Sequence, residues 1–191
     1  MVALPRTALT PFRYIARLPR GTGRNIGGGY AMAMAAAGAT ACYYLVVGVA
    51  IAVIGVRLAA AGDTVPVAFL VMAPVGLAMG TLQTAVFVAI PAFVCGVVAF
   101  RVVSADRRYA GPLAGLLATL LTYLVGGVLL AAIVLPLALL RGPTPSSAIN
   151  AAGSALGILT VAFLATSWAA LPLGAGAGAL YDRTRAQLGM V

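Results

Sequence analysis

The chain lacks the residue types on which most catalysis and metal binding depend. It has no histidine, no lysine and no glutamate, and its acidic residues are Asp63, Asp106 and Asp182. Without histidine there is no imidazole to act as a general base or to bind zinc. Asp106 and Asp182 each precede an arginine, which ion pairing explains, and Asp63 follows a glycine in a turn. We therefore expect no catalytic residue, no metal and no cofactor, and a protein that is not an enzyme.

Cysteine and charge are also scarce. Cys42 and Cys95 lie in apolar stretches without the CxxC spacing of a metal or redox pair, so we interpret both as small hydrophobic residues. Charged residues make up 8% of the 191 residues and hydrophobic residues 63%, and the mean hydropathy is +1.10. A soluble domain of this size carries far more charge. The composition indicates a protein whose main solvent is the bilayer.

The chain contains several long uncharged stretches. Residues 112–140 contain 29 residues without a charge, more than the about 18 that indicate a transmembrane helix. Four spans are predicted in all, at about residues 30–56, 80–100, 112–140 and 149–181. The sequence thus predicts an all-α integral membrane protein. Its four-helix domain occupies residues 30–181, between a basic cytoplasmic segment at 1–29 and a short cytoplasmic tail at 182–191.

The second span needs a further argument, because residues 65–100 contain 36 uncharged residues and are nearly long enough to cross twice. A single crossing puts ten of the 12 arginines on one side of the membrane and leaves only Arg57 and Arg141 on the other. Arginine is enriched in cytoplasmic loops. We therefore predict one crossing, with both termini in the cytoplasm and the protein in the cell membrane. Residues 65–79 are then an outer helical extension, an interfacial piece or a shallow re-entrant segment.

The chain also shows signs of an internal duplication. A shift of 79 residues lays Tyr44–Pro66 on Tyr123–Pro145, and ten of the 23 aligned positions are identical. A shift of 81 then pairs Phe100 with Tyr181. These matches predict two helical hairpins that form parallel repeats, as in some transporters. The alternative is that two hairpins in the same lipid have converged on similar residues.

Five arginines precede the first span, and we predict that they contact lipid headgroups: Arg6, Arg13, Arg17, Arg20 and Arg24. The negative cytoplasmic leaflet attracts each such residue by about 1 kcal/mol, so the expected partners are anionic lipids and not nucleic acid. Phe12 and Ile15 are expected to dip into the headgroups from a short interfacial helix. The glycine-rich stretch 21–29 reads as a flexible hinge and not as a phosphate-binding loop. A transit peptide is the alternative interpretation of the whole segment.

Polar side chains inside the spans are the candidate functional positions, namely Gln83, Thr81, Thr84, Thr122 and Tyr123. An unpaired amide in hydrocarbon is costly, so Gln83 is expected to face other helices, either for interhelical bonding or as the lining of a solute path. Glycines spaced G-x-x-x-G, which allow close helix packing, occur at Gly76/Gly80, Gly111/Gly115, Gly153/Gly157 and Gly174/Gly178.

Two functions fit this inventory. The first is a non-catalytic interaction or assembly subunit, or a scaffold, whose partners are a second copy of the chain or another membrane protein. The second is a small-solute transporter or channel subunit built from the duplicated hairpin. Polar residues that converge on one water-lined seam would favour transport, whereas polar residues scattered among separate helix contacts would favour the first function.

Overall fold

The computed structural model describes residues 14–15, 17–21, 23–61, 67–105, 109–142 and 144–189. Four long helices occupy most of this part of the chain: α2 (Arg24–Ala60), α3 (Val67–Val102), α4 (Ala110–Arg141) and α5 (Pro145–Gln187). All four are long and apolar enough to cross a membrane. A helix satisfies its backbone hydrogen bonds internally, which hydrocarbon demands. The predicted all-α fold with four membrane spans is confirmed, and the chain is a multi-pass membrane protein.

The helices are longer than the predicted spans. α3 continues without a break from Val67 to Val102, with Pro74 and Pro91 inside it, so residues 67–79 are helical and continuous with the predicted second span. α2 begins at Arg24, and Gly27, Gly28 and Gly29 are buried within it. The prediction of a flexible hinge at 21–29 is therefore wrong for these glycines. The reason is packing: their missing side chains make room for aromatic rings of other helices.

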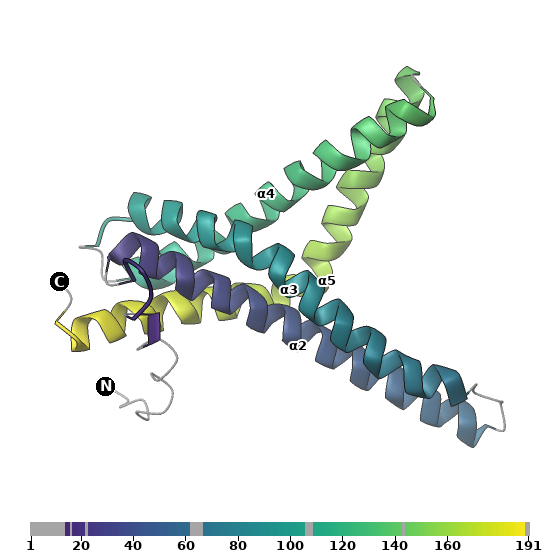
Figure 1. Ribbon diagram of the computed structural model, residues 1–191, viewed down its shortest axis with the longest axis horizontal. Helices are drawn as coiled ribbons and strands as arrows, with labels where there is room; N and C mark the ends of the chain where they lie inside the picture. The colour runs from purple at the N-terminus through teal and green to yellow at the C-terminus, as the bar shows by residue number, and fades with distance from the viewer. Residues whose placement is uncertain are drawn as a thin grey trace.

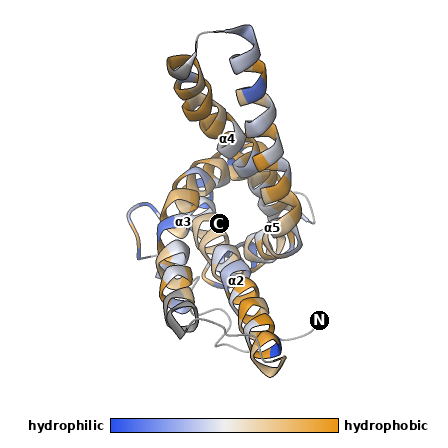
Figure 2. Ribbon diagram, turned by 90° about the vertical axis from the view of Figure 1, so that its right-hand side faces the viewer, coloured by the Kyte–Doolittle hydropathy of each residue, from blue (hydrophilic) through white to orange (hydrophobic). Residues whose placement is uncertain are grey.

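The helices pair into two antiparallel hairpins, α2 with α3 and α4 with α5. Figure 1 shows the hairpins packed together where α2 begins and α5 ends, and diverging toward the α2–α3 and α4–α5 connections. Across the packed end α2 contacts α5 and α3 contacts α4. Hydrophobic colour runs along much of each helix in Figure 2, including the diverging parts. The molecule is therefore joined at one end and open at the other.

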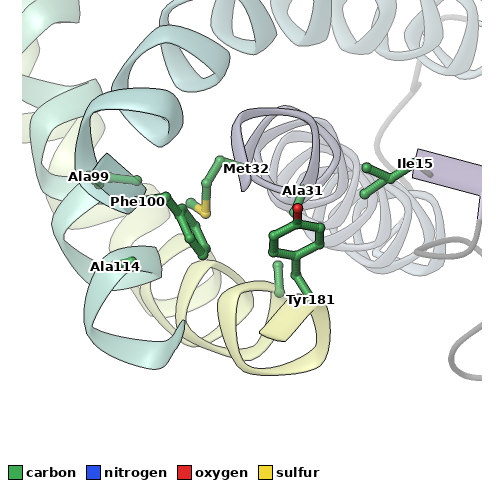
Figure 3. Close-up of a cluster of buried hydrophobic side chains, with 9 residues drawn as sticks. Ile15, Ala31, Met32, Ala99, Phe100, Ala114 and Tyr181 are labelled. Carbon is green, nitrogen blue, oxygen red and sulfur yellow. The ribbon is translucent and has the colours of Figure 1, made fainter. Parts of the chain in front are cut away.

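The core lies at the joined end and consists largely of small residues around two aromatic rings. Its buried hydrophobic residues are Ile15, Ala31, Met32, Ala99, Phe100, Ala114, Ala118, Ala177 and Tyr181 (Figure 3). Among the described side chains, those of α4 are buried only from Ala110 to Thr119 and those of α3 only from Ala92 to Phe100. Along the rest of the two helices the described side chains are exposed or half-buried, and some of them contact the other helix of their own hairpin.

Two tyrosines that the predicted repeat pairs make similar hydrogen bonds in the two hairpins. The Tyr44 hydroxyl hydrogen-bonds the Thr84 hydroxyl at 3.0 Å, across the first hairpin. Tyr123, which the 79-residue shift pairs with Tyr44, bonds Thr166 at 2.5 Å across the second. The shift-matched Phe100 and Tyr181 meet in the core with ring centroids 5.6 Å apart, edge to face. Tyr44 and Tyr123 therefore make similar contacts in the two hairpins, although neither shift pairs Thr84 with Thr166, and the parallel repeat stays a prediction.

Two of the predicted glycine pairs form a single contact. Gly111 lies against the Gly178 carbonyl and Gly115 against the Gly174 carbonyl, so the G-x-x-x-G motifs of α4 and α5 pack on each other. Such contacts bring helix backbones close enough for dense packing without a side chain between them. Gly76, Gly153 and Gly157 face open space instead. The G-x-x-x-G spacing thus predicted the two glycine pairs that form the helix crossing of the second hairpin. It did not distinguish them from the pairs that make no such contact.

Candidate functional site

The predicted polar positions do not converge on one seam. Thr84 and Tyr123 each bond within their own hairpin, to Tyr44 and to Thr166. Thr81 donates to the Leu77 carbonyl of its own helix at 2.7 Å. In the same way Thr122 donates to the Ala118 carbonyl at 2.8 Å. These four side chains make hydrogen bonds within their own hairpin, and Thr122 also lies within hydrogen-bond reach of the Cys95 thiol of α3.

Gln83 differs from the others because its side chain is exposed on α3. The expectation that it faces another helix of the chain is therefore wrong. The neighbouring hydroxyl of Thr84 is turned toward α2, where it bonds Tyr44, and successive residues on a helix point in different directions. Gln83 is the predicted position whose polar group points away from the bundle.

A second polar group of residues lies at the joined end, where sequence reasoning predicted only headgroup contacts. Arg24, at the first turn of α2, donates from Nη1 to the Phe100 carbonyl and to the Val103 carbonyl, each at 2.7 Å. Its guanidinium also stands over the Phe100 ring, 5.6 Å from the centroid. The last carbonyls of a helix have no partner within the helix, so Arg24 caps α3 from a neighbouring element. Among the described residues it thus binds the end of α3.

Tyr181 and Asp182 complete this group from α5. The Tyr181 hydroxyl donates to the Gly23 carbonyl at 3.3 Å, and the phenol ring lies over Gly27. Asp182 feels the charges of both Arg24 and Arg185. The carboxylate is half-buried near these two arginines. The joined end is held by the Phe100–Tyr181 ring contact and by the hydrogen bonds of Arg24 and Tyr181.

The remaining predicted arginines have mixed outcomes. Arg17 and Arg20 are exposed, while Arg6 and Arg13 lie outside the described residues. Ile15 is 1% exposed and belongs to the core beside Tyr181. The expectation that Ile15 dips into the headgroups is therefore wrong, because the bundle itself offers it an apolar site. This contact ties the segment before α2 to the end of α5.

Among the described residues no group of three or more histidine, cysteine, aspartate or glutamate side chains is placed to hold a metal ion. Cys42 is exposed and Cys95 is buried, and both are free thiols. A surface hollow lined by Ala52, Val53, Val56 and Arg57 lies on α2 alone. No polar side chain of another helix lines it, so it has the character of a lipid-facing groove.

Sequence signals existed for part of what was missed. Three consecutive glycines, Gly27 to Gly29, stand in the first turns of α2 and indicate close approach by another element. Gly27 lies against Tyr181 and Gly28 against Phe100. The contact between Arg24 and α3 joins residues 76 and 79 positions apart, and no local pattern reports such a pairing. Comparison with protein families, with curated proteins and with solved structures finds no match for this chain.

Proposed function

We propose that the protein is a non-catalytic interaction or assembly subunit of the membrane, which binds other membrane proteins through the diverging parts of its hairpins. One observation carries this proposal. The Tyr44–Thr84 and Tyr123–Thr166 hydrogen bonds lie in separate hairpins, and the side chain of Gln83 is exposed on α3, so these polar groups do not meet in one place. A solute path requires polar groups that converge on it, whereas a binding surface made of helix faces requires none.

The exposed surface of the diverging parts supports the same function. Val53 on α2, Leu129 on α4 and Ile158 on α5 are between 52% and 54% exposed, and they lie beyond the packed end. Helices in lipid associate through van der Waals packing and not through a hydrophobic driving force. Long unpaired helix faces that diverge from each other can accept a partner helix on several sides. The arrangement therefore suits docking better than enclosure of a solute.

Site-specific photocrosslinking in the native membrane tests the proposal. A photoreactive residue at Val53, Leu129 or Ile158 should give adducts with the same membrane protein, in amounts that match the chain. The matched control is Ala118, which is buried in the core, and there the label should capture only this chain. Lipid adducts alone at all three outer positions would contradict the proposal, as would solute flux through the purified protein in liposomes.

Anionic headgroups are the second class of partner that we propose. Exposed Arg17 and Arg20 stand at the joined end, just before α2, where the leaflet potential acts on basic residues. Mass spectrometry of the protein released from mixed-lipid micelles should show more anionic lipid retained by the natural chain than by a variant with Arg17→Ala and Arg20→Ala. Equal retention by the two proteins would refute this assignment.

A further inference from the structure

Gln83 carries an exposed amide at the depth where the predicted span places the centre of the bilayer. It lies at the middle of the 36 uncharged residues 65–100 and at the middle of α3. Its side chain is exposed and has no hydrogen-bond partner in the part of the chain that the structure describes. The headgroup region is about 15 Å away, half the thickness of the hydrocarbon core, which a glutamine side chain cannot span. An unpaired amide in this position costs free energy that a partner would recover.

The face of α3 around Gln83 is apolar and open. Met79, Phe87 and Ile90, at helical spacing from Gln83, are 60%, 77% and 65% exposed. Gly76, two turns before Gln83, has nothing near the position of a Cβ atom, so another helix can approach the backbone there. The face therefore offers a close contact at one end, large apolar side chains at the other and one polar group between them.

We propose that a second copy of this chain docks on this face of α3, with the two Gln83 amides hydrogen-bonded to each other. The proposal rests on the proposed function and names its first partner. Copies inserted in the same orientation have Gln83 at the same depth, so a two-fold axis along the membrane normal brings the amides together. A carboxamide both donates and accepts, and the pair satisfies itself. Such an isologous contact closes at two subunits.

The repeat explains why this contact forms once for each chain. The 81-residue shift pairs Gln83 of α3 with Leu164 of α5, which is 68% exposed. The second hairpin thus carries an apolar side chain where the first carries an amide. Polar residues at single positions in helix contacts fix partner and register. The asymmetry between the repeats directs association to α3 and away from α5.

Energy transfer between labelled copies of the full chain in liposomes tests the dimer. Cys42→Ser and Cys95→Ala remove the native thiols, and Gln187→Cys, exposed at the end of α5, carries the dye. Transfer should fall as the protein is diluted with lipid and give a dissociation constant. Gln83→Leu should weaken the dimer about three- to thirty-fold, the range expected for hydrogen bonds between helices in a membrane. Phe87→Ala, on the same face, should weaken it as well.

Leu164→Ala is the matched control, because it alters the equivalent face of the second hairpin and should leave the dimer unchanged. Circular dichroism should show the same helix content in all variants, since the altered side chains are exposed. The proposal is overturned if the protein is monomeric at every dilution, if Gln83→Leu dimerises as well as the natural residue, or if Leu164→Ala weakens the dimer equally. If the protein is monomeric but its outer positions still give photoadducts with another membrane protein, the dimer is wrong and the proposed function stands. If the protein dimerises but gives no adducts with another membrane protein, the dimer stands and the proposed function is wrong.

Discussion

Arg24 shows how one residue at the edge of the membrane joins two helices. Its Nη1 atom reaches two carbonyls at the end of α3 while its backbone begins α2. Hydrogen bonds from a charged donor are stronger than those between neutral groups. The beginning of the first hairpin thus depends on a side chain that the sequence suggested for lipid.

Removing this cap should destabilise the protein. Arg24→Ala eliminates both bonds to α3 and should lower the free energy of unfolding by about 1.5–3 kcal/mol, as expected for hydrogen bonds to a charged group. Unfolding by SDS in mixed micelles measures the change. Arg183→Ala is the control, because Arg183 is exposed on α5 and its removal should change stability little. Equal losses in the two variants would mean that the cap contributes no more than an exposed charge.

The contacts of individual side chains are harder to predict from the sequence than the helices are. Hydrophobic runs identify a span but not the direction in which each side chain points, so Gln83 was expected inside and lies outside. Arg24 and Ile15 were assigned to lipid because both belong to a basic segment, yet both bind the bundle. Each error has the same origin: the partner lies far away in the chain. For Tyr44 and Tyr123 the sequence provided more information, because the 79-residue shift pairs them and they make similar hydrogen bonds.

The glycine crossing of α4 and α5 governs how closely the second hairpin packs. In Gly115→Ala the new methyl group would meet the Gly174 backbone, which cannot move aside as a side chain can. Overpacking of this kind costs about 1–3 kcal/mol, and SDS unfolding should show the loss. Gly126→Ala is the matched control on the same helix, because its methyl group would meet nothing within 4 Å. Unchanged stability in Gly115→Ala would show that the helices are not in backbone contact.

The two tyrosine bonds should be energetically alike if the hairpins are repeats. A double-mutant cycle of Tyr44→Phe with Thr84→Val should give a coupling energy of about 0.6 kcal/mol, the average for hydrogen bonds between membrane helices. The cycle of Tyr123→Phe with Thr166→Val should give the same value. Unfolding free energies of the eight proteins supply both couplings. A coupling confined to one hairpin would contradict equivalent packing.

Helices were easier to predict than residues because the bilayer imposes one strong rule. Uncharged length identified four of them, and the arginine count favoured a single crossing by the segment that forms α3. The ends were less accurate, since α2 begins at Arg24 and α5 extends to Gln187. A helix can continue beyond the hydrocarbon core, so the length of a span predicted from the positions of charged residues is shorter than the length of the helix.

At the scale of the whole molecule the packed ends of both hairpins lie together (Figure 1), and the arginine distribution predicts that this end is cytoplasmic. Reporter fusions after Arg57, Arg108, Arg141 and Arg185 should therefore read outside, inside, outside and inside. Alkaline phosphatase and fluorescent reporters distinguish the two sides. An inside signal at Arg141 would contradict the four-span topology.

The divergence of the hairpins was not foreseeable from the sequence, although helix length gives it a physical reason. The 32 uncharged residues between Arg24 and Arg57 span about 48 Å as a helix, against a hydrocarbon core of about 30 Å. Tilting is one way for a long helix to match a thinner bilayer. Two hairpins that tilt in opposite directions from a common base form the shape in Figure 1.

A base with two leaning arms also acts on the lipids around it. We expect acyl chains beside each hairpin to tilt with its helices, so that they spread apart in the leaflet that holds the open end and crowd together in the opposite leaflet. The two leaflets then prefer different areas, and a membrane relieves that difference by curving with its open-end side convex. We expect the protein, reconstituted with its open end outward, to concentrate on small vesicles over large ones, which fluorescence per unit of lipid measures. With Gly115→Ala, which forces the second hairpin apart at its base, that preference should change.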